Sequence, residues 1–129
     1  MSSTESPSGQ APGPLDVDVE RLDSSIALLI PKGGLDGEQL EHALRSSIGT
    51  LVAEGVTGLV IDLRSYAVLD SSGLGALVAS RGDVAEASGA RLVLTGVGQG
   101  LHRTLSRSML LQVLPVYETV ERASAALRA

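Results

Sequence analysis

The 129-residue chain carries a formal net charge of −5, 43% hydrophobic residues and no cysteine. This length favours a single domain, whose core must be almost wholly aliphatic because Phe and Trp are absent. The lack of cysteine excludes disulfides and thiolate metal sites, and the lack of a basic cluster argues against nucleic-acid binding. No apolar run approaches the roughly 20 residues of a membrane span and no signal peptide is recognisable, so we expect a cytoplasmic protein without membrane contact.

The amino-terminal residues differ in composition from the rest of the chain. Residues 1–14 are rich in serine, proline and glycine and hold almost nothing that a core could bury. We therefore predict a disordered tail over residues 1–14. One folded domain is expected over residues 15–129.

Two strands are predicted at the start of the folded part. Residues 15–20 alternate apolar and acidic side chains, which is typical of a strand with one solvated face. Residues 26–30 form a continuous apolar run that indicates a buried strand, ended by Pro31. The Asp-Ser-Ser sequence at 23–25 can turn the chain, so we expect an antiparallel pair with the wetter strand at the sheet edge.

A helix is predicted to begin after Asp36. Asp36 is a favourable N-cap, and Gln39 stands three residues later, at the spacing of a capping box. Gly55 is suited to end this helix. One face carries apolar residues at helical spacing, namely Leu40, Ala43, Leu44, Ile48, Leu51 and Val52.

A buried strand and a second helix are predicted in the middle of the chain. Residues 59–63 form a short apolar run that suits a buried strand, and residues 64–69 form a loop. Residues 70–73 read Asp-Ser-Ser-Gly, and Asp and Ser both satisfy free backbone N–H groups at a helix start. The helix is expected to end at Gly89 and to bury a stripe formed by Leu74, Leu77, Val78, Val84 and Ala85.

The last third of the chain adds a strand over 91–95, helices over 98–107 and 117–127, and a short final strand at Val113-Leu114. Parallel pairing is expected for strands that are separated by a helix. The predicted fold is a single α/β domain, with an open mixed sheet of four to five strands covered by about four helices. The residues expected to point inward from the last two helices are Leu101, Leu105, Val120, Ala123 and Leu127.

The serines at the start of the second helix have two interpretations. Short polar side chains cap helix starts, which explains Ser71 and Ser72 without any function. A serine at this position also lies beside unpaired N–H donors and the positive end of the helix dipole, where a phosphate can be held or added as a switch. The two interpretations are compatible if Ser72 turns inward to cap the helix and Ser71 stays exposed.

The sequence Asp-Ser-Ser-Gly-Leu-Gly at 70–75, preceded by Ile-Asp-Leu at 61–63, resembles the signature of STAS domains of the anti-sigma factor antagonist type. The resemblance extends from about Leu15 to the C-terminus. It implies a non-enzymatic regulator without a cofactor, in which a partner kinase phosphorylates Ser71. That kinase is itself the anti-sigma factor, and phosphorylation would end binding and keep the sigma factor captive. A phosphatase would reverse the modification, and the chain would be a monomer or weak dimer.

The resemblance also implies a partner-binding surface around this serine, made up of Asp36, Asp70, Ser72, Gly73 and Leu74. The chain departs from the family pattern at two positions. Gly34 stands where family members commonly carry a carboxylate, and Met109 stands where a glycine is usual. An exposed hydrophobic segment at 109–111 would either pack inward or help to bind a partner.

Enzymatic and metal-binding functions find little support in the sequence. A nucleophile elbow needs glycine two residues before the serine, and Leu69 precedes Ser71 instead. His42 and His102 are expected to be solvated surface residues, and two isolated histidines form no metal site.

Two alternatives stay open. The Gly-Val-Gly-Gln-Gly sequence from Gly96 to Gly100 follows a strand and precedes a helix, but Leu101 stands where a dinucleotide fingerprint needs glycine. A small nucleotide-binding regulator is therefore one alternative, although the glycines also suit a tight turn. The other alternative is a scaffold subunit of a stressosome-type complex, in which the same serine controls the release of a kinase.

Overall fold

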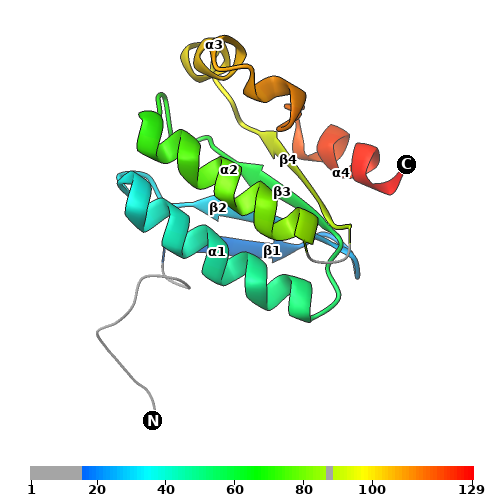
Figure 1. The fold of residues 1–129 in the computed structure, drawn as a ribbon. Helices are drawn as coiled ribbons and strands as arrows, with labels where there is room; N and C mark the ends of the chain where they lie inside the picture. The colour runs from blue at the N-terminus through cyan, green and yellow to red at the C-terminus, as the bar shows by residue number, and fades with distance from the viewer. Residues whose placement is uncertain (1–15, 87–88) are drawn as a thin grey trace.

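The computed structural model describes residues 16–86 and 89–129 (Figure 1). The predicted tail over residues 1–14 lies outside the described residues. The elements are β1 (Val17–Arg21), β2 (Ile26–Pro31), α1 (Gly37–Ala53), β3 (Gly58–Asp62), α2 (Ser71–Glu86), β4 (Arg91–Thr95), α3 (Gln99–Arg107), a 3₁₀ turn η1 (Leu110–Gln112) and α4 (Val120–Arg128).

The strands form one sheet in the order β1-β2-β3-β4. β1 pairs antiparallel with β2, while β2, β3 and β4 are parallel to one another, which confirms the predicted mixed sheet. Helices α1 and α2 lie side by side across one face of the sheet (Figure 1), and α4 packs on the other face against β2, β3 and β4. The α/β fold and the edge position of the first strand are as predicted.

Alternation along the strands divides the core between the two faces of the sheet. Leu29, Ile61 and Leu94 are fully buried on the face covered by α1 and α2. The opposite face carries a smaller cluster in which Val60 packs against Ala123 of α4. Side chains of neighbouring strand residues point to opposite faces, so the run at 26–30 is buried on both sides.

The amphipathic prediction for the first strand is wrong at Val19. Val19 lies opposite Leu29 in the register, yet 46% of its surface is exposed. Its position in an edge strand leaves the side chain beside a shallow groove next to α1, and the groove is lined by the polar residues Ser46 and Thr50. Only Val17 of β1 is buried.

The predicted stripe of α2 is also wrong at Val78, which is 43% exposed, while the predicted Ala85 lies outside the residues whose burial the structure describes. The buried positions are instead Ala76, Leu77, Ser80 and Val84. Ala76 and Ser80 are small, and Ser80 donates its hydroxyl proton to the Ala76 carbonyl at 2.9 Å, which satisfies it within the helix. Small side chains allow α1 and α2 to pack closely, and this packing turns Val78 outward.

The final strand predicted at Val113-Leu114 is not formed. η1 occupies the preceding residues, and the only pairing in this part of the described chain is an isolated parallel bridge between Leu94 and Val116. Tyr117 belongs to this bridge, since its N–H donates to the Leu94 carbonyl at 2.9 Å. The last helix therefore begins at Val120 rather than at Tyr117, with Thr119 as its N-cap.

None of the helices within residues 16–86 and 89–129 is long and apolar enough to cross a membrane.

Candidate functional site: the start of helix α2

Three loops and three helix starts follow the parallel strands β2, β3 and β4. They meet at the carboxyl-terminal ends of these strands. Parallel strands end at the same edge, so the segments that follow them meet there. A Cβ added at Gly33 would lie 3.2 Å from the Ser65 Cβ, and one added at Gly100 would lie 3.6 Å from the Ala67 carbonyl oxygen. The loop over residues 63–70 therefore lies between the starts of α1 and α3 and leads into α2.

Asp70 is the residue that caps α2. Its Oδ1 accepts a hydrogen bond from the Gly73 N–H at 2.9 Å, and its carbonyl accepts the Leu74 N–H at 2.9 Å. Ser71 and Ser72 are both exposed. The condition that Ser72 turns inward to cap the helix is not met, because Asp70 at the N-cap position already accepts the Gly73 N–H through Oδ1. Ser71 is thus the first helical residue, with a hydroxyl free of any capping role.

Ser72 has a different structural role. A Cβ added at Gly37 would overlap the side chain and backbone of Ser72, so the first turn of α1 touches the first turn of α2 only because residue 37 is glycine. Asp36 caps α1 through the predicted capping box: its Oδ1 accepts the Gln39 N–H at 2.8 Å, and the Gln39 Oε1 accepts the Asp36 N–H at 2.9 Å. The exposed Asp36 therefore immediately precedes the residue that contacts Ser72.

A buried carboxylate anchors the loop that precedes Ser71. Asp62 is 3% exposed, and it accepts the backbone N–H of Arg64 at 2.9 Å and the Arg64 Nε–H at 3.0 Å. The bonds to the Asp62 carboxylate raise the pKa of Arg64. A Cβ added at Gly96, which has a φ of 69°, would overlap this carboxylate. Gly96 is therefore explained by the packing of Asp62.

Tyr66 joins the same loop to the end of β2. Its hydroxyl donates to the Lys32 carbonyl at 2.6 Å. Burial of the ring raises the pKa of Tyr66, because the charged form would lose its hydration. Together, Tyr66 and Asp62 hold both ends of residues 62–66 against the sheet, and this fixes the approach to α2.

The remaining residues expected at the partner surface are less accessible. Gly73 is buried, and a Cβ there would lie 2.8 Å from the Leu69 Cδ2. Leu74 is half-buried against the main core. Asp36, Asp70, Ser71 and Ser72 are thus the members of the predicted set that expose their side chains.

Two exposed valines belong to this surface and were missed by sequence reasoning. Val68 precedes Ser71 by three residues and is 69% exposed, while Val78 lies two helical turns after Ser71 on the same face of α2. The signal at Val68 was its position in the loop predicted over residues 64–69, between a buried strand and a helix. Val78 was missed because it fits the spacing of the apolar stripe that the sequence predicts for this helix.

Gly34 and Met109 both adopt left-handed backbone conformations. Gly34 has a φ of 87°, which explains glycine at this position. Met109 has a φ of 60° and is 64% exposed, while Leu110 and Leu111 pack against the core. Within the expected segment at 109–111, only the methionine is therefore a hydrophobic surface residue.

The remaining candidates from the sequence are the two histidines and a possible metal site. His42 and His102 are exposed, as expected. No group of three potential metal ligands occurs among residues 16–86 and 89–129.

The comparisons with known proteins agree with this geometry. Residues 18–123 match the family model of the STAS domain. An anti-sigma factor antagonist from Mycobacterium paratuberculosis has a similar structure, with 28% identity and a TM-score of 0.71 over 88% of this chain and 93% of that chain.

Two further solved structures show the same fold at lower identity. A variant of RsbS from Moorella thermoacetica is 21% identical, with a TM-score of 0.72 over 87% of this chain and 94% of its own. The phosphorylated form of the Bacillus cell fate determinant SpoIIAA is 22% identical, with a TM-score of 0.63 over 87% of this chain and 99% of its own. The family model covers most of the chain, including the mixed sheet and the start of α2, and the chain therefore belongs to the STAS domain family.

Proposed function

We propose that this chain is an anti-sigma factor antagonist that is switched by phosphorylation of Ser71. The unphosphorylated form binds an anti-sigma factor with serine-kinase activity and thereby releases the sigma factor. The observation that carries the proposal is the exposed Ser71 at the first position of α2, where Asp70 and not the serine caps the helix. The similarity to the Mycobacterium paratuberculosis antagonist supports this role.

Electrostatics give the switch a physical basis. A phosphate would add about −1.5 to −2 charges to a surface that already exposes Asp36 and Asp70. The positive end of the α2 dipole stabilises such a charge in the free domain, so the fold tolerates phosphorylation. In a complex, the partner surface excludes water and strengthens the repulsion between like charges. Phosphorylation therefore blocks docking without unfolding the domain.

The partner surface in this proposal combines charge and apolar area. In this surface, Asp36, Asp70 and Ser72 surround Ser71. Gly73 and Leu74 pack on the core side of the first turn of α2 and set its position. Val68 and Val78 supply exposed apolar side chains on either side of the serine. The chain acts as a regulator and not as an enzyme, and a phosphatase that removes phosphate from Ser71 restores binding.

Phosphorylation is tested with the kinase that the chain recovers from native cell extract. The wild-type chain is incubated with this kinase and ATP, and the phosphate is located by mass spectrometry. We expect a single phosphate on Ser71, no phosphate on Ser71→Ala, and normal phosphorylation of Ser72→Ala, since Ser72 lies against α1. Phosphate on Ser71→Ala would contradict the assignment.

Partner binding is tested with Ser71→Glu, which places a carboxylate at the start of α2. We expect at least tenfold weaker binding of the anti-sigma factor, which corresponds to about 1.4 kcal/mol. The matched control is Ser46→Glu, which adds the same charge at an exposed position of α1. Equal loss of affinity in both variants would point to net charge rather than to the Ser71 site.

A further inference from the structure

β4 is the second edge strand of the sheet, and its outer edge is only partly covered. The Arg91 N–H donates to the Thr57 carbonyl at 2.8 Å, and the Thr95 carbonyl accepts the Leu63 N–H at 3.0 Å, so both residues bond toward β3. Leu94 bonds outward instead: its N–H donates to the Pro115 carbonyl at 2.8 Å, and its carbonyl accepts the Tyr117 N–H. Residues 115–117 thus cover the edge at Leu94.

The edge is unpaired at Leu92, a residue that is 5% exposed at the bottom of a hollow. Bonding directions alternate along a strand, so the N–H and C=O of Leu92 point outward like those of Leu94. Within the described ranges, no hydrogen bond outside the sheet involves the backbone of Leu92. An unpaired edge position of this kind can pair with another extended chain.

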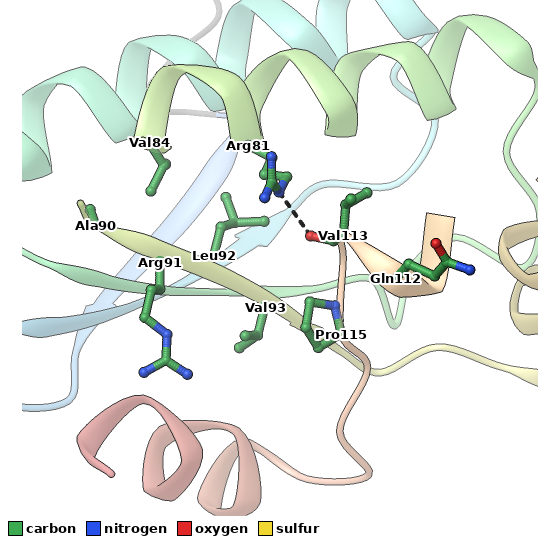
Figure 2. Close-up of a pocket in the computed structure, with 9 residues that line it drawn as sticks. All are labelled: Arg81, Val84, Ala90, Arg91, Leu92, Val93, Gln112, Val113 and Pro115. Atoms are coloured by element: carbon green, nitrogen blue, oxygen red, sulfur yellow. Dashed lines mark hydrogen bonds between the residues drawn. The ribbon is translucent and has the colours of Figure 1, made fainter. Parts of the chain in front are cut away.

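A hollow lies directly beside this open position. Its floor is β4, one wall is the second half of α2 and the other wall is the segment after η1 (Figure 2). Its lining includes Leu92, Arg81 and Arg91. Pro115 closes one end, because the bridge to Leu94 begins there. The hollow therefore lies where an added strand would pair with Leu92.

The two arginines lie on opposite sides of β4. Arg81 belongs to α2 and donates from Nε to the Val113 carbonyl at 3.0 Å, while Arg91 points toward α4 and donates to the Ala126 carbonyl at 3.4 Å (Figure 2). Among residues 16–86 and 89–129, neither arginine forms a salt bridge, in contrast to Arg21, Arg45, Arg64, Arg122 and Arg128. In a chain with a net charge of −5, these two cations mark a local positive site.

We propose that this hollow binds an extended acidic segment of a partner protein, which adds a short strand to β4 at Leu92. Main-chain hydrogen bonds to an edge strand supply affinity, and side-chain contacts supply specificity. Successive side chains of the added strand point to opposite faces. One carboxylate therefore reaches Arg81 on the α2 side, and a neighbouring carboxylate reaches Arg91 on the α4 side.

This second surface is separate from the phosphorylation switch. Arg81 follows Ser71 by ten residues along α2, which corresponds to about 15 Å of helix. The open edge lies beside the second half of α2, away from the helix start that carries Ser71. The chain can therefore hold a second partner segment whether or not Ser71 is modified.

The proposal is tested by titrating the ¹⁵N-labelled full chain with the capped peptide acetyl-Thr-Val-Glu-Glu-Val-Thr-amide and following the amide resonances by NMR. We expect saturable shifts at Leu92 and its neighbours and at the Nε–H groups of Arg81 and Arg91, with millimolar-range affinity. Ser71→Glu should leave these shifts unchanged, so this result is independent of the proposed function. The absence of shifts at Leu92 at millimolar peptide would overturn the proposal.

Matched controls separate strand pairing from simple attraction between charges. The peptide with Gln-Gln in place of Glu-Glu should bind weakly, and the acidic peptide with N-methylated central amides should not bind, because it cannot form the main-chain bonds. Arg81→Gln with Arg91→Gln should weaken binding about tenfold, at about threefold for each arginine. Arg103→Gln with Arg107→Gln changes the net charge equally on α3 and should have no effect.

Two results would overturn the assignment in favour of another occupant. Inorganic phosphate that produces the same shifts at Leu92 and both arginines would indicate a small-anion site. Equal binding by the N-methylated peptide would indicate attraction between charges without an added strand. If the double variant fails to fold, Arg91→Gln alone provides the test, because within residues 16–86 and 89–129 its side chain makes a single hydrogen bond, the 3.4 Å bond to the Ala126 carbonyl of α4.

Discussion

The division of work between Asp70 and Ser71 is the central feature at the scale of single residues. Asp, Ser and Thr all cap helices, so the sequence at 70–72 offers three candidates for one role. The structure gives the capping role to Asp70, whose Oδ1 bonds the Gly73 N–H. Ser71 is left exposed at the helix start, which is the requirement for a modified side chain.

Met109 is a residue whose backbone conformation conflicts with its side chain. It has a φ of 60° and a ψ of 21°, in the left-handed region that favours glycine. Its side chain is 64% exposed, so little apolar burial offsets this strain. We expect Met109→Gly to raise the free energy of unfolding by about 1 kcal/mol, measured by urea denaturation.

The matched control for this prediction is Ser108→Gly. Ser108 has a φ of −86°, where glycine offers no relief of strain. We expect this neighbouring change to leave stability unchanged or to lower it slightly, through the added entropy of the unfolded chain. Equal effects of the two substitutions would contradict a role for left-handed strain at Met109.

Asp23 links the β1–β2 turn to the C-terminal helix. It accepts the N–H groups of Ser25 and Ile26 through Oδ1 and the Arg128 Nε–H at 2.9 Å through Oδ2. The backbone bond from Ser25, followed by the bond from Arg128, lowers the pKa of Asp23. A pKa lowered by folding contributes stability that is present above the unfolded value of about 3.9 and lost as the pH falls through the folded value.

We therefore expect the stability difference between the wild-type chain and Asp23→Asn to depend on pH. The wild type should be more stable above about pH 4, and the difference should shrink as the pH is lowered further, because both side chains are then uncharged. Urea denaturation at a series of pH values measures this difference. A difference that stays constant, or grows, in acid would contradict the linkage.

At the scale of elements, the contact between α1 and α2 positions the candidate site. Two helix starts that each carry a capping carboxylate, Asp36 and Asp70, meet through the contact between Gly37 and Ser72. Any side chain at residue 37 would push the two helix starts apart. The surface around Ser71 is therefore a product of close helix packing and not of α2 alone.

Gly37→Ala tests this dependence. The added methyl group would overlap Ser72, and we expect a loss of about 1–3 kcal/mol in unfolding free energy together with weaker partner binding. The control is Gly82→Ala, where an added Cβ meets no atom within 4 Å. Alanine favours a helix over glycine, so Gly82→Ala should raise stability by up to about 1 kcal/mol. Equal destabilisation by both changes would contradict the packing argument.

At the scale of the whole molecule, the two sheet edges determine how copies of the chain can associate. Antiparallel pairing of two β1 strands about Val19 would place Asp18 opposite Glu20 of the second copy. Like charges directly opposite one another destabilise strand pairing, so this edge is protected. Residues 115–117 cover β4 at Leu94 and leave only a short opening, which is too short for a continuous sheet between two copies.

We therefore expect the chain to elute as a monomer in size-exclusion chromatography with light scattering. Neutralising the β1 edge with Asp18→Asn and Glu20→Gln should increase self-association at high protein concentration. A very large particle formed by the wild-type chain would favour the stressosome-type scaffold over a small partner-switching protein.

The nucleotide-binding alternative also belongs to this scale. The structure explains Gly96 by its left-handed backbone and its contact with Asp62, where a Cβ would overlap the carboxylate. A Cβ at Gly100 would lie at an ordinary contact distance of 3.6 Å from the Ala67 carbonyl oxygen, so this contact does not require glycine. Nucleotide binding at residues 96–100 stays a prediction that calorimetry with GTP and ATP can test.

The sequence alone determined the order of the four strands and four helices, the mixed sheet, the capping box at Asp36 and the family motif at 70–75, because these follow from local periodicity, capping chemistry and short-range spacing. Only the tertiary structure decided that Val78 faces outward, that Ser72 lies against Gly37, and that residues 115–117 form a bridge instead of a strand at Val113-Leu114. Each of these depends on which elements pack together and how closely. Distances between segments remote in the sequence are fixed by the shape of the whole core, and local patterns of residues do not encode them.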